Sequence, residues 1–194
     1  MKRTILFLAI FCFVLSGAFA QLSFGVSVQQ YFERNEEGKL PGFSEAWKSF
    51  QDGEGLYWGL FAEIMAGKLG VGFSFNNQVY SNDDPLIDLP DMWNYDANAY
   101  LAVHLFGGKA FIDPFAQIGV GQWGFGFVES SDPMMASWYM DYGVGLGLNI
   151  GIVGAFVKAM WNQQLDEPVE VQGGYAWEFP VMPFKWVFGA KVIL

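Results

Sequence analysis

Residues 69–80 read Leu-Gly-Val-Gly-Phe-Ser-Phe-Asn-Asn-Gln-Val-Tyr, so large apolar residues alternate with glycine or small polar residues along almost the whole stretch. Successive side chains of a β-strand point to opposite faces of the sheet, so this stretch predicts a strand with one apolar and one glycine-rich face. Glycines and small amides make an unusual water-facing surface, but they suit a crowded interior. The alternation therefore favours a barrel that is apolar toward lipid and polar within.

The same alternation recurs along the rest of the chain. Strands are predicted at about 22–32, 56–66, 69–80, 92–106, 111–127, 138–149, 153–162 and 183–194. A membrane-spanning strand takes roughly 9 to 11 residues, which these stretches meet or exceed. In the fifth stretch Ile118 and Val120 share one parity, whereas Trp123 and Phe125 have the other. A β-bulge near 121–124 is predicted to bring all four onto the apolar face.

The predicted connections alternate between short and long. The short ones lie at 67–68, 107–109 and 150–151, and the long ones at 33–55, 81–91, 128–137 and 164–182. Short turns at one end and long loops at the other are the habit of bacterial outer-membrane barrels, where they are periplasmic and extracellular respectively. The predicted fold is therefore all-β, an eight-stranded antiparallel up-and-down transmembrane β-barrel.

The N-terminus has the features of a cleavable secretory signal peptide. Lys2 and Arg3 precede an apolar run over 5–15, and Ala18-Phe19-Ala20 forms a small-residue cleavage site. We therefore predict a signal peptide at 1–20, a single barrel domain at 21–194 and export to the cell outer membrane. Cys12, the only cysteine, falls inside the signal, so the exported chain has no thiol for a disulfide or a metal.

Composition agrees with an exported membrane protein. The hydrophobic fraction is 53% and the charged fraction only 15%, against about 25% charged in an ordinary soluble domain. The net charge of -10 makes nucleic acid an unsuitable partner. The predicted long connections hold sixteen acidic residues and three basic ones, so the outer end is expected to be strongly negative.

The alternation, the loop pattern and the C-terminus together resemble the small eight-stranded outer-membrane barrel families, such as the OmpA transmembrane domain and OmpX. The final residues look like the C-terminal signal read by barrel-assembly machinery, with Gly189 followed by apolar Val192 and Leu194. Leu194 stands where that signal usually has an aromatic residue, and Val187 where a polar one is usual. The resemblance implies the assembly machinery and outer-membrane lipid as partners.

Several ionisable residues are predicted to point into the barrel. They are Glu63, Asp96, Asp141, Lys158, Lys185, Lys191 and His104. An eight-stranded barrel is only wide enough for side chains to fill it, so these groups predict a plug of hydrogen-bonded ion pairs rather than a pore. A narrow selective conductance is the alternative, but leaving such charges unpaired in the interior would be costly.

Two features of the long loops are candidate functional elements. The oxygen ligands that Ca²⁺ prefers are available in the second loop from Asp83, Asp84, Asp88 and Asp91. Their spacing matches no defined calcium loop, so a solvated acidic surface is the favoured interpretation and no metal or cofactor is predicted. In the first loop, Ser44 is predicted to cap a helical turn whose Phe43, Trp47 and Phe50 share one face and pack on the barrel rim or the lipid interface.

No catalytic motif stands out. His104 is the only histidine and has no serine within two residues, which argues against the Ser-His-acid arrangement of lipid-modifying outer-membrane enzymes. The repeated glycines at 143–147 lie within a predicted strand and are read as barrel alternation, not as a nucleotide-binding loop.

The leading hypothesis is thus a non-enzymatic outer-membrane barrel with a structural role or with surface contacts, to an extracellular ligand or a host surface, through its acidic loops. Three alternatives remain open: a soluble exported lipocalin-like barrel that binds an apolar ligand, a lipid-modifying outer-membrane enzyme, and a narrow channel.

Overall fold

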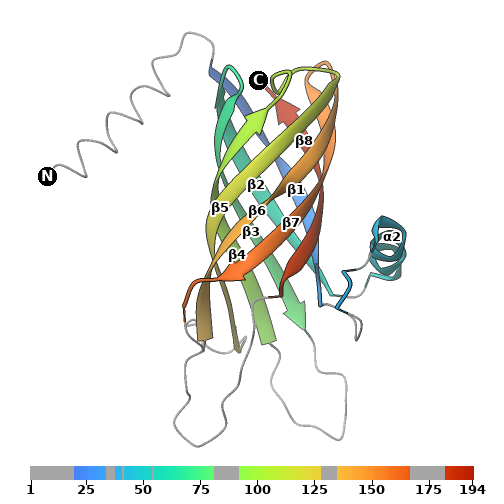
Figure 1. Ribbon diagram of the computed structural model, residues 1–194, viewed down its shortest axis with the longest axis vertical. Coiled ribbons are helices and arrows are strands. Elements are labelled where there is room, and N and C mark those ends of the chain that lie inside the picture. The colour runs from blue at the N-terminus through green and yellow to red at the C-terminus, as the bar shows by residue number, and fades with distance from the viewer. Residues whose placement is uncertain are drawn as a thin grey trace, which may run out of the picture.

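The computed structural model describes residues 20–33, 38–40, 42–53, 55–80, 92–127, 135–166 and 182–194. Eight antiparallel strands close into one barrel in sequence order, with β1 paired to β8, and Figure 1 shows the strands tilted steeply around the barrel. The strands are β1 (Ala20–Phe32), β2 (Leu56–Ala66), β3 (Leu69–Tyr80), β4 (Met92–His104), β5 (Ile112–Phe127), β6 (Met135–Ile150), β7 (Val153–Gln164) and β8 (Phe184–Ile193). The predicted eight-stranded up-and-down barrel is therefore confirmed. Within the described ranges no helix is long and apolar enough to span a bilayer.

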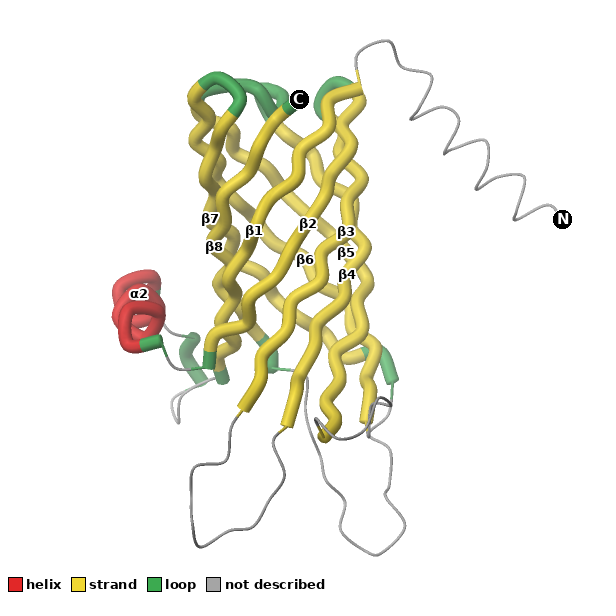
Figure 2. The backbone as a smooth tube through the Cα atoms, turned by 180° about the vertical axis from the view of Figure 1, so that it is seen from behind, coloured by secondary structure: helices red, strands yellow, loops and turns green. Residues whose placement is uncertain are grey.

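Short connections gather at one end of the barrel, which we call the turn end. They join β2 to β3, β4 to β5 and β6 to β7, and each contains a glycine with positive φ, at Gly67, Gly107 and Gly151. A positive φ is readily adopted only by glycine, which explains this residue at each turn. The chain enters β1 and leaves β8 at the same end (Figure 2). The strand ends that the long connections join all lie at the opposite end, the loop end, as predicted. The predicted signal peptide lies almost wholly outside the described residues.

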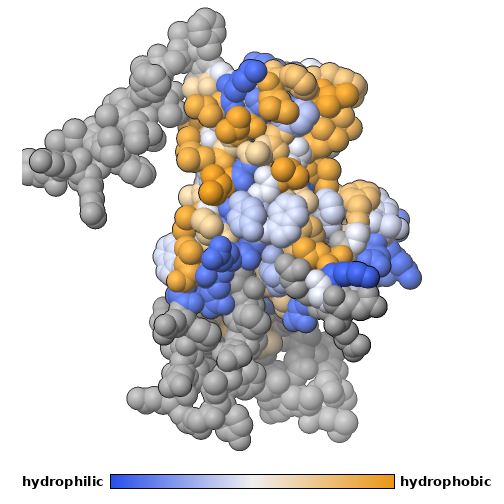
Figure 3. Space-filling view, viewed as in Figure 1, coloured by the Kyte–Doolittle hydropathy of each residue, from blue (hydrophilic) through white to orange (hydrophobic). Residues whose placement is uncertain are grey.

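The side chains are arranged inside out relative to a soluble barrel. Along β3, Val71 and Phe73 are exposed on the outer surface, whereas Asn76 and Gln78 are buried inside. The same parity holds on the other strands, and hydrophobic residues cover much of the barrel surface in Figure 3. The outer surface is therefore an apolar belt, and the interior is largely polar.

The bulge predicted in β5 is absent. β5 pairs with β4 and β6 without interruption, with Gly121 opposite Asn98 and Trp123 opposite Asp96. Trp123 and Phe125 therefore point inward, where the indole nitrogen of Trp123 donates a hydrogen bond to the Tyr57 hydroxyl. The prediction was wrong because it assumed that every large apolar side chain faces outward. Near the loop end, aromatic rings help to fill the interior.

β2 and β3 have the predicted bounds at both ends, and the other strands begin or end one to three residues away from the predicted positions. β4 ends at His104 and not at 106, because residues 105–111 form the turn to β5. The first-loop helix, α2 (Phe43–Asp52), begins one residue before Ser44, and its N-cap is Gly42. Ser44 lies inside the helix as its second residue and therefore does not cap it, while the Gly42 amide donates to a Glu45 carboxylate oxygen.

Inward glycines make room for aromatic rings from neighbouring strands. A Cβ added at Gly121 would lie 2.4 Å from the Tyr139 ring, whereas a Cβ at Gly147 would lie 3.5 Å from its nearest neighbour, in Asp113. Gly121→Ala must therefore displace Tyr139, and overpacking of this kind typically costs about 1–3 kcal/mol. Gly147→Ala is the matched control and should be neutral or stabilising by up to about 1 kcal/mol, because alanine loses less backbone entropy on folding.

Urea unfolding of both variants in lipid vesicles measures these free energies. Equal stability of the two variants would show that Tyr139 does not depend on the space above Gly121.

Candidate functional site

The barrel interior holds two clusters of charged side chains. The cluster nearer the loop end brings together Asp96, Asp141 and Lys185. The cluster nearer the turn end brings together Glu63, His104 and Asp113. Between them lie apolar side chains together with Lys158 and Gln117.

Asp96 is the centre of the loop-end cluster and is fully buried. One carboxylate oxygen accepts hydrogen bonds from Gln29 Nε2 at 2.5 Å, the Tyr31 hydroxyl at 2.5 Å and Lys185 Nζ at 2.9 Å. The other oxygen accepts from the Tyr139 hydroxyl. These donors come from β1, β6 and β8, so one carboxylate on β4 ties together strands on opposite sides of the barrel.

Lys185 shares its charge between two carboxylates. Its Nζ lies 2.9 Å from Asp96 and 3.6 Å from Asp141, and it sits over the Tyr139 ring at 5.0 Å from the ring centre. A buried charge is tolerated only when it is paired and hydrogen-bonded, which these contacts achieve. Of the residues predicted from sequence, Asp96, Asp141 and Lys185 thus form one network.

The turn-end cluster is organised by His104. Its Nδ1 lies 2.6 Å from an Asp113 carboxylate oxygen, and its Nε2 lies 3.1 Å from a Glu63 oxygen. The ring also stacks on Phe115, with 5.0 Å between centres. Lys191 is buried and lines the same small cavity as Glu63 and His104. Both ring nitrogens of His104 therefore face carboxylates, which is not the arrangement of a histidine that activates a serine.

Sequence reasoning missed Asp113, which is fully buried. The sequence prediction for this strand concerned a bulge near 121–124, and it assigned no face to the polar residues at the start of β5. The alternation Asp113, Phe115, Gln117 was nevertheless present, and continuing it to Gly119 and Gly121 would have placed Asp113 inside. Tyr31 was also missed, because its position at the end of β1 gave no sign that its hydroxyl reaches Asp96.

Lys158 lies between the two clusters and makes a different kind of contact. Its Nζ donates to Gln117 at 3.1 Å and sits 5.2 Å from the ring centres of both Tyr100 and Phe156. Cation-π contacts contribute to holding a desolvated lysine. Among the described residues no carboxylate lies within salt-bridge distance of Lys158, so it does not form the ion pair that the sequence predicted.

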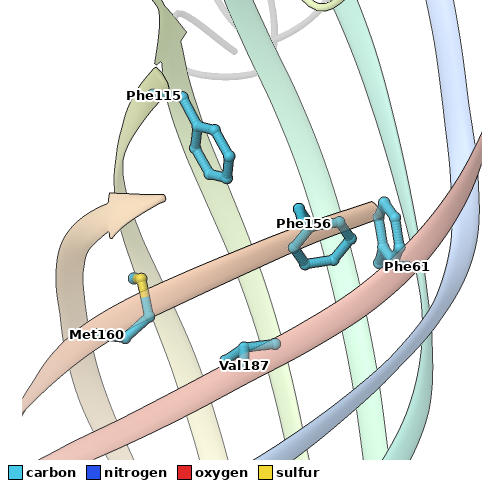
Figure 4. Packing of buried hydrophobic residues seen from close by; sticks show 5 residues of the cluster. All are labelled: Phe61, Phe115, Phe156, Met160 and Val187. Atoms are coloured by element: carbon cyan, nitrogen blue, oxygen red, sulfur yellow. The ribbon is translucent and has the colours of Figure 1, made fainter. Parts of the chain in front are cut away.

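An apolar layer closes the middle of the barrel. It comprises Phe61, Phe115, Phe156, Met160 and Val187, whose side chains project inward in Figure 4. Phe61 and Phe156 meet edge to face, with ring centres 5.1 Å apart. Cavities of about 10 and 20 Å³ remain beside this layer, each enough for about one water molecule. The described middle of the interior is thus packed with side chains around two small cavities.

The four acids proposed as calcium ligands, Asp83, Asp84, Asp88 and Asp91, lie outside the described residues. Within the described ranges no group of three or more acidic or histidine side chains is placed to hold a metal ion.

Asp166, one of the acids at the loop end, is held by hydrogen bonds to two residues near the start of β6. Its carboxylate accepts hydrogen bonds from the Ser137 hydroxyl at 2.5 Å and the Trp138 amide at 2.7 Å. Burial alone would raise the pKa of Asp166, but these hydrogen bonds outweigh it and hold the pKa below its ordinary value.

Known structures share this architecture at low sequence identity. No family model matches the chain, and no curated protein matches it. The N-terminal β-barrel domain of Pseudomonas aeruginosa OprF aligns with a TM-score of 0.55 and 9% identity, over 90% of this chain and 97% of that domain. Ail of Yersinia pestis, crystallised with the heparin analogue sucrose octasulfate, aligns with a TM-score of 0.46 and 14% identity, over 90% and 97% of the respective chains. The OprF similarity is one of fold, and it agrees with the expected β-barrel architecture.

The two inward lysines should differ in their contribution to stability. Lys185→Met removes the partner of buried Asp96, and breaking a buried ion pair in this way costs about 3–5 kcal/mol. Lys158→Met is the matched control, since it removes a hydrogen bond to a neutral amide and two cation-π contacts but no ion pair, and it should cost about 1–3 kcal/mol. Both free energies of unfolding are measured by urea titration in lipid vesicles. If Lys158→Met lowered the free energy of unfolding as much as Lys185→Met does, the ion pair between Asp96 and Lys185 would not be the more stabilising of the two lysine contacts.

Proposed function

We propose that the chain is a non-enzymatic integral barrel of the bacterial outer membrane, with its loop end extracellular. The observation that carries the proposal is the inside-out distribution of side chains. Isolated exposed apolar residues are common on soluble proteins, but a belt around the whole barrel is far larger than the patches such proteins expose. A bilayer is the solvent that makes this surface favourable, and a closed barrel satisfies the backbone hydrogen bonds there.

The lipocalin-like alternative is less well supported. A soluble barrel that binds an apolar ligand requires a sizeable apolar cavity, and ligand sites commonly measure about 300–1,000 Å³. The cavities beside the apolar layer measure only about 10 and 20 Å³, and buried charges line them.

An enzymatic role also has little support. His104 is only 2% exposed, and its ring nitrogens face Glu63 and Asp113. A lipid substrate would have to reach it through the filled interior or the barrel wall.

Function is therefore best sought at the loop end, as surface contact with cationic or divalent-bridged partners or as reinforcement of the envelope. The excess of acidic residues in the loop sequences is what supports a charge-based contact.

A charge placed on the belt tests whether lipid covers it. Val120 is 47% exposed at the middle of β5, and Ile150 is 71% exposed at the turn end of β6. In a membrane barrel an outward arginine costs about 2–4 kcal/mol at the bilayer midplane and about 0–1 near the interfaces. Val120→Arg should therefore destabilise the vesicle-inserted protein much more than Ile150→Arg does, as measured by urea unfolding. Equal small losses would mean that water, not lipid, surrounds the belt.

Because side chains pack the middle of the barrel, we expect the protein not to conduct ions. Planar-bilayer recording of the refolded full chain should show no stepwise conductance, because the apolar layer and the charge clusters pack the middle of the barrel. Reproducible open-channel steps would overturn the structural or surface-contact role in favour of a channel.

A further inference from the structure

Helix α2 lies outside the barrel, against the seam between β1 and β8. Figures 1 and 2 show it beside the loop end of the barrel and not over its mouth. The Phe188 ring on β8 contacts Phe43, Trp47 and Phe50, at centre distances of 6.2, 5.7 and 5.1 Å. Gln30 on β1 donates a hydrogen bond to the Ser49 hydroxyl. The helix is thus attached to both strands of the seam.

The register of the seam orients the helix relative to the belt. Gln30 pairs with Trp186, and Phe188 pairs with Val28, which lies two residues nearer the turn end. The Ser49 contact is therefore on the loop side of the helix, and the contacts with Phe188 are on the side nearer the belt. Phe43 also packs edge to face on Trp186, with ring centres 5.4 Å apart. In Figure 3 the hydrophilic side chains at the position of α2 accordingly lie toward the loop end.

The aromatic edge of α2 is only partly covered by the barrel. Phe43 is 50% and Trp47 43% exposed, although Ala46 on the barrel side is completely buried. The next outward residues of β1 toward the turn end are Val26 and Phe24, which are themselves exposed. The aromatic edge of α2 is therefore continuous with the apolar belt of the barrel.

The side of the helix opposite the buried Ala46, which faces away from the barrel, is polar. At 100° per residue, it carries Ser44, Glu45, Lys48, Gln51 and Asp52. An amphipathic helix of this kind, lying across the end of a lipid-facing belt, has the geometry of a helix buried to the depth of the headgroup and acyl boundary.

We propose that α2 is an interfacial helix that binds the lipid of the outer leaflet, with Phe43 and Trp47 inserted at the headgroup and acyl boundary. This inference rests on the proposed membrane function. Lys48 is offset by Glu45 and Asp52, so electrostatic attraction to anionic lipid contributes little. Affinity comes from apolar burial and from the attachment to β1 and β8, which keeps the helix at high effective concentration next to the membrane. The helix thereby shields the loop end of the closing seam from water.

Spin-label accessibility tests the proposal. Single cysteines replace Trp47, Phe43, Lys48 or Val120 in a full-length Cys12→Ser background, and each carries a nitroxide. The proteins are reconstituted into phosphatidylcholine and phosphatidylglycerol vesicles, and folding is checked by circular dichroism. Collision rates with oxygen, which concentrates in lipid, and with a neutral nickel chelate, which stays in water, are then compared.

The labels at Trp47→Cys and Phe43→Cys should show an oxygen-to-nickel ratio several-fold above that of Lys48→Cys and close to that of Val120→Cys. Two aromatic-edge sites are used so that one remains if the other variant does not fold. Ratios at both sites equal to that of Lys48→Cys, with Val120→Cys lipid-exposed, would overturn the interfacial helix and leave the membrane barrel standing. A water-exposed Val120→Cys label would instead overturn the membrane function on which the proposal rests.

Discussion

The structure depends on one constraint: polar side chains inside a narrow closed barrel must satisfy one another. Asp96 shows how this is met, because a single carboxylate with no solvent exposure accepts hydrogen bonds from Gln29, Tyr31, Tyr139 and Lys185. Those partners come from three other strands. The network therefore specifies how strands far apart in sequence face each other across the interior, while the backbone ladder alone joins neighbours. Leaving any one member unpaired would carry the full cost of a buried polar group.

The glycines of the inward face follow from the same lack of space. A Cβ at Gly72 would meet the Tyr100 ring, one at Gly145 the Phe115 ring, and one at Gly189 the Phe156 ring, each at 2.3 Å. Large inward rings thus lie over glycines of adjacent strands. The glycine-rich alternation over 69–80 therefore reflects packing, because small inward residues on one strand leave space for the rings and charged side chains of the neighbouring strands.

The strands and the inward placement of most charged residues were predictable from the sequence, because the alternation of side chains along a strand is a local property. The bounds of β3 agree with the prediction, and the inward placement of Asp96, Lys185 and His104 followed from counting by two. The orientation of Trp123 was not predictable from hydrophobicity, since aromatic rings serve equally as lipid contacts and as interior filling. The docking of α2 was only partly predictable, because its contact with Phe188 joins segments more than a hundred residues apart. Which carboxylate pairs with which base also required the three-dimensional register.

The central claim is that lipid, not water, contacts the outer face while the polar face is enclosed. Nuclear Overhauser effects between lipid acyl chains and methyl groups of the protein in lipid nanodiscs test it most directly. The structure predicts cross-peaks from acyl chains to outward methyls such as those of Val71 and Val144, and none to the buried inward methyls of Val187 and Ile193. Acyl contacts to Val187 and Ile193, with water contacts at Val71 and Val144, would contradict the inside-out barrel.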